Sequence, residues 1–454
     1  MRILLAANGY PPHRWAGTET YTAGLAEQLQ QRGHLVQVLC VGDWNAGPHH
    51  WNGYSDEVHH GVPLRRLNLN WMKAPDPSGY LYSNPVVADY VAGFLRQTRP
   101  DLVHVTSCET LSASILNVVK EAGLPLVLSL TDFWFLCPRI NLLRSDGANC
   151  NGLKTAWDCL RCQLLHKRAY RWPRRLFSEQ GTSRLLMKIS QYPLLTRQRG
   201  LRGMAADMAD RKTILRQALS RADYRITASH FVRNIFVENG VTEPIHVQPY
   251  GHDLSWLARY HGKTSSDVIR YGFIGQILEA KGVHLFLEAA QSLQENMPSR
   301  FRLSIFGDLQ KTPEYGARLI SQAAHMPGVQ FCGTYPYDQS AEVFSSIDVL
   351  VVPSLWFDFP LIIYEAFATG TPVIATNLGG MAEAVSHEVN GLLFERNDKD
   401  DLARQLRRFI DEPPLLNKLR AGIPKVKTNE EEVTELEAIY RNLLTDRSTS
   451  KNYT

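Results

Sequence analysis

Short apolar runs alternate with amphipathic stretches along the whole chain. Continuous apolar segments bounded by glycine, proline, asparagine or aspartate predict buried strands, and apolar residues recurring every three or four positions predict helices between them. Strands that alternate with helices in this way form parallel sheets covered by helices on both faces. The pattern therefore predicts an α/β protein built from doubly wound domains.

The predicted strands fall into two groups, one in each half of the chain. In the first half, strands are expected at residues 2–7, 34–40, 62–69, 101–106, 124–130, 222–228 and 245–251. In the second half, strands are expected at residues 268–274, 301–306, 329–333, 349–352 and 372–376. A polar stretch without periodicity separates the groups. We therefore expect two domains joined by a linker.

The boundaries of these domains follow from the same pattern. The domains are an N-terminal domain (1–253), a linker (254–267), a C-terminal domain (268–428) and an amphipathic final helix (429–446). We expect this final helix to cross back to the first domain, as is usual in the fold that the resemblance described below implies.

Composition is ordinary for a globular protein of this size. The 454 residues are 44% hydrophobic and 21% charged, enough for two or three domains with substantial cores. Charges or prolines interrupt every apolar run before it reaches a membrane-spanning length, and the first residues read as a strand rather than a signal peptide. We therefore expect a cytoplasmic protein, located in the cytosol or at the inner face of the membrane.

The most informative stretch runs from residue 351 to residue 381 and predicts a strand, a loop, a helix and a second strand. Glu365 lies one turn into the helix, near the carboxyl ends of the strands, where open parallel sheets bind ligands. A carboxylate there can accept hydrogen bonds from two adjacent hydroxyls, as in a ribose or sugar diol. The alternative is a first-turn charge favoured by the helix dipole.

Five short segments of this half follow one another in a fixed order and spacing. They are PS (353–354), FPLIIYEA (359–366), GTPVIAT (370–376), GG (379–380) and NGLL (390–393). This order and spacing resemble the donor half of the family 4 retaining glycosyltransferases, nucleotide-sugar-dependent enzymes of the glycogen-synthase/sucrose-synthase superfamily. The resemblance implies the GT-B fold, in which two Rossmann-like domains face each other across a cleft.

The resemblance also assigns donor-binding residues. Glu365 matches the glutamate that holds the nucleotide ribose, whereas the glutamate that touches the transferred sugar falls on Phe357. Asp358 follows one residue later, so either it replaces that glutamate or the sugar contact is lost. Gly379 and Gly380 complete the donor motif that the resemblance implies.

The loop after the strand at 268–274 supplies the other donor residues. Lys281 matches the lysine that clamps the donor diphosphate, and Gly275 opens the loop. A cation is needed there because the leaving diphosphate gains charge in the transition state. Gln276 stands where the family often has an arginine, so more of this role rests on Lys281. The alternative for Lys281 is a surface lysine at the start of a helix.

Two positions in the first half match acceptor-side elements only in part. Gly17, in Ala16-Gly17-Thr18-Glu19, stands in a loop that the family places near the donor phosphates and the acceptor. Asp132, in Thr131-Asp132, could orient the acceptor hydroxyl or accept its proton. The alternatives are a turn glycine and an Asx-turn aspartate.

Four of the seven cysteines cluster in one predicted loop: Cys137, Cys150, Cys159 and Cys162. An odd total without an export signal argues against disulfides. Four thiolates can close a tetrahedral zinc shell, although this spacing is not that of a standard zinc finger. Three alternatives stay open: structural zinc, unligated thiols, and an iron–sulfur or redox pair.

Residues 163–221 are strongly basic and place cationic and apolar side chains at helical spacing. Such a helix can lie on an anionic membrane face or hold a lipid-linked pyrophosphate acceptor. The alternative is a solvated helical insertion. The sequence shows no module that binds nucleic acid, so we expect no nucleic-acid partner.

The sequence thus predicts a retaining glycosyltransferase of the hexosyltransferase type. It would move a sugar from a nucleoside-diphosphate donor to a glycan or lipid-linked acceptor in cell-surface polysaccharide or lipopolysaccharide biosynthesis. No cofactor is expected for catalysis, and structural zinc is the one metal considered. The rivals are a nucleotide-sugar epimerase or phosphorylase on the same fold and a non-catalytic glycan- or partner-binding protein.

Overall fold

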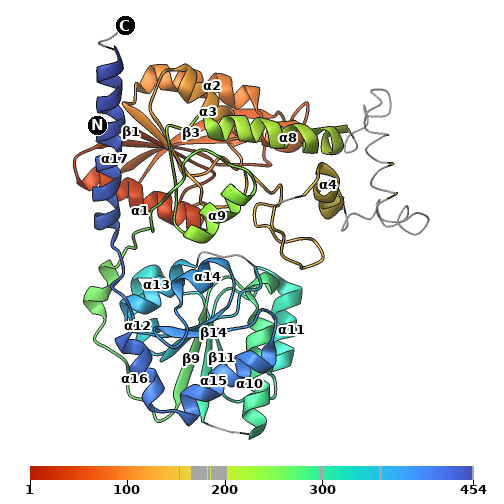
Figure 1. Ribbon diagram of the computed structural model, residues 1–454, viewed down its shortest axis with the longest axis vertical. Coiled ribbons are helices and arrows are strands. Elements are labelled where there is room, and N and C mark those ends of the chain that lie inside the picture. Colours follow the sequence, from red (N-terminus) through yellow and green to blue (C-terminus); the bar gives the residue numbers. More distant parts are fainter. Residues whose placement is uncertain are drawn as a thin grey trace. The chain divides into compact units, whose positions relative to one another are not determined.

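The computed structural model describes residues 1–152, 154–164, 181, 185, 202–296, 300–356 and 360–451 (Figure 1). The chain forms two compact units, and each contains one sheet. The first unit is Met1–Tyr250 with Asn429–Thr454, and the second is Gly251–Thr428. The predicted α/β class, with parallel sheets in two domains, is confirmed.

The first unit is built on an eight-stranded sheet with the order β3-β4-β2-β1-β5-β6-β7-β8. Its strands are β1 (Arg2–Ala7), β2 (Leu35–Val41), β3 (Trp51–His59), β4 (Val62–Leu69), β5 (Leu102–Val105), β6 (Leu126–Ser129), β7 (Tyr224–Thr227) and β8 (His246–Val247). All neighbours pair in parallel except β3, which pairs with β4 in the antiparallel sense. The loops after β1, β5 and β6 therefore meet at one edge of the sheet.

Strand β3 is absent from the sequence-based prediction, and its side chains explain why. Most of them are exposed or half-buried, so this edge strand lacks a clear apolar pattern. Its carboxylates pair with the two arginines of β4. Arg65 forms two bonds of 2.6 Å to Asp56, and Arg66, which is 1% exposed, pairs with Glu57. The polar strand thus neutralises charges that β4 buries.

The helices of the first unit cover both faces of its sheet (Figure 1). They are α1 (Gly17–Gln31), α2 (Pro85–Thr98), α3 (Ser114–Glu121), α4 (Ala156–Leu164), α8 (Arg202–Ser220), α9 (His230–Glu238) and α17 (Asn429–Lys451). The last helix, α17, packs against α1. Tyr440 of α17 also lies 2.6 Å from the buried His104 ring of β5, so this C-terminal helix is part of the core of the first unit.

The second unit has a six-stranded, fully parallel sheet with the order β11-β10-β9-β12-β13-β14. Its strands are β9 (Ile269–Ile274), β10 (Phe301–Phe306), β11 (Val329–Gly333), β12 (Val349–Val352), β13 (Val373–Thr376) and β14 (Gly391–Phe394). Its helices are α10 (Val283–Asn296), α11 (Pro313–Ala323), α12 (Ser340–Ser345), α13 (Leu361–Ala368), α14 (Gly379–Ala384), α15 (Lys399–Asp411) and α16 (Pro414–Ala421).

Alternate residues of β12 belong to two different hydrophobic cores. Val349 and Val351 pack in one cluster, and Leu350 and Val352 pack in the other. Side chains of a strand alternate between the two faces of its sheet, so both faces are covered. This explains why the strands of this unit are continuous apolar runs in the sequence.

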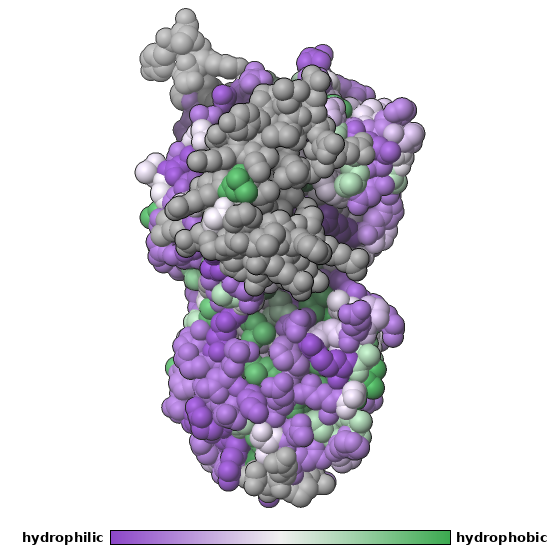
Figure 2. Space-filling view, turned by 90° about the vertical axis from the view of Figure 1, so that its right-hand side faces the viewer, coloured by the Kyte–Doolittle hydropathy of each residue, from purple (hydrophilic) through white to green (hydrophobic). Residues whose placement is uncertain are grey.

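The described surface and helices bear on contact with a membrane. On the face seen in Figure 2, the coloured surface is mostly hydrophilic, and hydrophobic side chains form small separate groups. Within the part of the chain that the structure describes, no helix is long and apolar enough to cross a membrane. Much of the basic insertion predicted at 163–221 lies outside the described residues, and its last part forms α8.

The connection from β9 to α10 is held by a glycine that has no space for a side chain. A short 3₁₀ turn (Glu279–Lys281) ends at Gly282, whose φ is +72°. A Cβ at Gly282 would lie 1.9 Å from the carbonyl oxygen of Pro353, in the loop after β12. The two loops can therefore lie side by side only if residue 282 is glycine.

Gly282→Ala should destabilise the second unit much more than Gly370→Ala. Gly370 also has a positive φ, +65°, but a Cβ there would meet no atom within 4 Å. Gly370→Ala should therefore cost about 1 kcal/mol of backbone strain, and Gly282→Ala roughly 2 kcal/mol more because the facing loop must move. The urea concentration at which amide protection in β9–β14 is lost measures this. Equal effects of the two changes would contradict the assigned contact.

Candidate functional site

The donor-side residues predicted from the sequence come from loops that follow neighbouring strands of the second unit. Strands β9 and β12 pair through Leu350 and Gly272, so the loops after them start side by side. The backbone N–H of Leu355 donates to the carbonyl of Ala280 at 2.8 Å, and the buried Ser354 hydroxyl donates to the same carbonyl at 3.3 Å. These bonds hold the loops at residues 275–282 and 353–356 together.

Glu365 lies in the first part of α13, which begins after the β12 loop. The carboxylate forms no hydrogen bond or ion pair with any other residue of the described chain. Burial raises its pKa to about 7, and the nearby Asp253 contributes to the same rise. A half-buried carboxylate without a cation carries a desolvation cost, and a ligand that donates hydrogen bonds would relieve that cost.

Two tyrosines face the same carboxylate. The pKa values of Tyr335 and Tyr337 are raised, first by burial and next by the Glu365 charge. The Tyr337 hydroxyl donates to the backbone carbonyl of Asp253 at 2.8 Å, which fixes its position. The surroundings of Glu365 are therefore aromatic and acidic, and the described residues supply no cation to it.

The loop after β9 carries Gly275, Gln276 and Lys281, which the structure brings next to the β12 loop. Gly275 has a φ of +156°, and its N–H donates to the Phe306 carbonyl at 3.0 Å, so it joins the ends of β9 and β10. The Lys281 ammonium lies 5.5 Å from the centre of the Trp356 ring, a cation–π contact between the two loops. Lys281 is thus held against the β12 loop, not projected freely into solvent.

Gly379 and Gly380 follow β13, the next strand of the sheet. Gly379 has a φ of +55° and opens α14, and Gly380 is buried. The hydroxyl of Thr376, at the end of β13, is buried and has no hydrogen-bond partner among the residues placed in the structure. Phe357 and Asp358 lie outside the described residues, so the sugar-binding role of Asp358 stays a prediction.

On the acceptor side, Asp132 follows β6 in the first unit. Its Oδ1 accepts a hydrogen bond of 2.7 Å from the Trp134 N–H, which is the Asx-turn geometry considered as the alternative. Burial nevertheless raises the pKa of Asp132 to about 7; Glu109 and Glu19 also act to raise it, and Arg211 acts to lower it. The side chain therefore both shapes the turn and can exchange a proton near neutral pH.

Two further carboxylates of this group come from distant parts of the chain. Glu19, in the first turn of α1, is 1% exposed and lies 3.0 Å from the Arg14 guanidinium. Glu109, in the loop after β5, accepts a hydrogen bond of 3.0 Å from the Asn8 amide. In the sequence Glu19 stands out only as part of a motif, and Glu109, Asn8 and Arg14 were missed because no local pattern marks them.

Gly17 is the first residue of α1, and its backbone does not demand glycine. A Cβ at this position would meet no atom within 4 Å, and its φ is not in the left-handed region. Neither turn geometry nor packing therefore explains the glycine. The open space above its Cα is compatible with the close approach of a ligand.

The four clustered cysteines are free and line one pocket with about 480 Å³ of empty space. Backbone N–H groups donate to two of the sulfurs, from Arg139 to Cys137 and from Gly152 to Cys150, each at 3.4 Å. No three His, Cys, Asp or Glu side chains in the described ranges are arranged so that they could hold a metal ion. The structure thus brings Cys137, Cys150, Cys159 and Cys162 to one cavity without forming a closed ligand shell.

Two family profiles match the chain. The profile of the group 1 glycosyl transferases matches residues 261–426, and that of the glycosyl transferase 4-like domain matches residues 16–182. A D-inositol 3-phosphate glycosyltransferase of Catenulispora acidiphila is 31% identical over 182 residues, which are 38% of this chain and 44% of that protein. The chain thus matches less than half the length of such curated relatives.

Solved structures share the fold over nearly the full length. Sucrose-phosphate synthase from Thermosynechococcus elongatus aligns over 98% of this chain and 100% of its own, with a TM-score of 0.65 and 17% identity. Anabaena HepE in complex with UDP-glucose aligns over 99% and 100%, with a TM-score of 0.60 and 17% identity. Between them the two profiles span most of the chain, which therefore belongs to the group 1, family 4-like glycosyltransferases with the GT-B fold.

Proposed function

We propose that the protein is a retaining hexosyltransferase that uses a nucleoside-diphosphate sugar as donor. The acceptor would be a glycan or a lipid-linked glycan in the biosynthesis of cell-surface polysaccharide or lipopolysaccharide. The reaction would then take place in the cytoplasm or at the inner face of the membrane. Family membership supports the reaction class, and the arrangement around Glu365 supports the donor class.

The observation that carries the proposal is the half-buried carboxylate of Glu365, which accepts no hydrogen bond from any described residue. Burial makes its ionised form costly. The vicinal hydroxyls of a ribose would supply two donors to it. A nucleotide bound there explains why a carboxylate is kept in a site that disfavours its charge.

The remaining donor-side residues fit the other end of a nucleoside diphosphate. Lys281 would hold the diphosphate, and the backbone at Gly275 and Gln276 would approach it closely. Gly379 and Gly380 would leave room for the donor beside β13, and Asp358 would contact the transferred sugar. Solved neighbours bound to UDP, UDP-glucose and ADP agree with a nucleotide donor.

On the acceptor side, Asp132 would orient the acceptor hydroxyl, with the loop that carries Gly17 beside it. Retaining transfer by same-face attack needs a leaving phosphate that helps to deprotonate the acceptor. It therefore needs a positioned hydroxyl more than a strong base. The pKa of Asp132 is raised to about 7. In its ionised form the carboxylate can accept a hydrogen bond from the acceptor hydroxyl and so orient it, while the leaving phosphate takes the proton.

Calorimetric titration with UDP-, GDP- and ADP-sugars should show one preferred donor. Lys281→Ala should weaken that donor about tenfold to a hundredfold and leave the affinity for the corresponding nucleoside unchanged, because only the diphosphate loses a charged contact. Glu365→Gln should weaken both the donor and the nucleoside by a similar factor, because both carry the ribose. Failure of every donor to bind would favour the non-catalytic alternative.

Matched controls are available in the same unit. Lys418 forms an exposed ion pair with Glu388, and Glu342 is an exposed carboxylate of α12. Lys418→Ala and Glu342→Gln should leave donor affinity unchanged. Slow release of nucleoside diphosphate from the preferred donor would then separate an enzyme from a binding protein.

Donor affinity should rise with pH through about 7. Diol hydroxyls favour the ionised form of Glu365, and in the free protein that form becomes dominant only above its pKa of about 7. Between pH 6 and pH 8 the dissociation constant should therefore fall by about tenfold. In Glu365→Gln this dependence should disappear. A wild-type profile that stays flat would show that Glu365 does not contact the donor.

Structural zinc at the four cysteines is a separate part of the proposal. Their common pocket and the N–H bonds to two sulfurs support it. No three of these side chains in the described ranges are arranged to hold a metal ion, so zinc would have to draw the sulfurs together. Mass spectrometry of the purified protein should find about one zinc per chain, and Cys159→Ser with Cys162→Ser should remove it. Cys332→Ser, outside the cluster, is the control. Zinc-free protein with unmodified thiols would establish the unligated alternative.

A further inference from the structure

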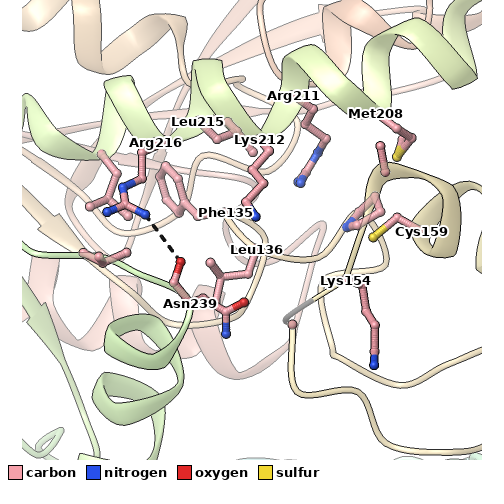
Figure 3. A pocket seen from close by; sticks show the side chains of 15 residues that line it. Phe135, Leu136, Lys154, Cys159, Met208, Arg211, Lys212, Leu215, Arg216 and Asn239 are labelled. Carbon is pink, nitrogen blue, oxygen red and sulfur yellow. Dashed lines mark hydrogen bonds between the residues drawn. The ribbon is translucent and has the colours of Figure 1, made fainter.

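A second pocket of the first unit, separate from the donor side, lies beneath α8 (Figure 3). It contains about 660 Å³ of empty space, part of it open to solvent, and we call it the α8 pocket. Its lining comes from residues 135–138, the start of α4, one face of α8 and the loop after α9. Residues far apart in the sequence thus meet around one hollow.

The lining of the α8 pocket is cationic. It includes Lys154, Arg211, Lys212 and Arg216, and no aspartate or glutamate is among its described lining residues. The ammonium groups of Lys154 and Lys212 form no hydrogen bond or ion pair with any residue that the structure places. Figure 3 shows Arg211 and Lys212 pointing from α8 toward the residues of the 135–138 loop. Positive charges that converge on one hollow repel one another, and an anion between them lowers that cost.

Arg211 is the most buried of these cations. It is 7% exposed, its guanidinium donates to the Trp134 carbonyl, and it lies 5.4 Å from the centre of the Trp134 ring. These contacts orient the side chain. Asp132 and Cys159 act electrostatically on the guanidinium, but no described carboxylate forms an ion pair with it, so an anion in direct contact would stabilise it.

Most of the other lining residues are apolar. Leu136, Pro138 and Met208 are half-buried and keep some apolar surface available to a ligand. Leu215, Leu219 and Val241 also line the pocket but are already buried, at 0%, 1% and 4% exposed. A ligand that fits this lining has an anionic group joined to an apolar group.

The wall of the pocket is already formed without a ligand. The Asn239 amide donates to the carbonyls of Asn151 and Ile235, each at 2.8 Å, and Arg216 donates to the Asn239 carbonyl at 3.4 Å. Gly152 has a φ of +81°, and a Cβ there would lie 2.6 Å from the Asn239 amide oxygen. A preformed wall reduces the ordering cost of binding.

We propose that the α8 pocket binds the diphosphate of a lipid-linked acceptor. The diphosphate would lie between Arg211, Lys212 and Lys154, and the first part of the lipid chain would lie against Leu136 and Met208. The loop that borders the pocket begins at Asp132, so an acceptor anchored by its phosphates would present its sugar end toward that carboxylate. This inference rests on the proposed transferase function and names its acceptor class.

The test uses the full-length protein and two soluble probes, inorganic diphosphate and farnesyl diphosphate. The variant is Lys154→Glu with Lys212→Glu, two exposed side chains that form no described hydrogen bond or ion pair. The control is Arg221→Glu, an exposed cation that follows α8 and does not line the pocket. Each protein is titrated with both probes and, separately, with its nucleotide-sugar donor.

Farnesyl diphosphate should bind at least about tenfold more tightly than inorganic diphosphate, because only the former reaches the apolar lining. The double variant should weaken both probes by at least about tenfold, whereas Arg221→Glu and the donor titrations should show no change. Equal affinity of the wild type and the double variant for farnesyl diphosphate would overturn the proposal.

A membrane surface and free diphosphate are the two competing ligands for these charges. Binding to phosphatidylglycerol vesicles that the double variant abolishes, without any binding of the soluble diphosphates, would assign the charges to a membrane surface and overturn the proposal. Binding of free diphosphate equal to that of farnesyl diphosphate would overturn the lipid-linked part of it. If the probes bind as expected and no nucleotide sugar binds, the α8 pocket is confirmed as a diphosphate site and the proposed transferase function is wrong.

Discussion

Parallel pairing of strands determines where this molecule can carry out chemistry. Parallel neighbours must be joined by crossovers, so all the loops that follow strands meet at one edge of the sheet. In the second unit the loops after β9, β12 and β13 carry Lys281, Glu365 and Gly379 to that edge. In the first unit the loops after β5 and β6 carry Glu109 and Asp132 there. Residues that are far apart in the sequence thus lie at the same edge of a sheet, although no sequence motif contains them all.

The same constraint explains which parts of the fold the sequence could predict. Buried parallel strands are continuous apolar runs, so the limits of β1, β4 and β10 were predicted as the structure has them. Strand β3 was missed because an edge strand with solvent on one side lacks that pattern. Arg65 and Arg66 interrupt the apolar run of β4, and two buried arginines need carboxylate partners. Asp56 and Glu57 of β3 are those partners.

The site was predictable only where its residues are close in sequence. Glu365 and Gly379 belong to one continuous motif, so spacing alone could place them on a strand–loop–helix–strand unit. Glu109 and Arg14 join Glu19 through tertiary packing, and the sequence shows no period or spacing that connects them. The α8 pocket is similar, because its cations come from two segments that only the folded chain brings together.

The first unit places opposite charges along one short loop. At Asp132, burial raises the pKa of the aspartate, and the nearby Glu109 and Glu19 raise it further and make the surroundings acidic. A few residues later, Phe135 and its neighbours border the cations of the α8 pocket. A ligand with an anionic end and a hydroxyl end has one favourable direction along this loop, because phosphate is repelled by the carboxylates whereas a hydroxyl can donate to them. Orientation of the acceptor would then follow from charge, before any contact with a particular sugar.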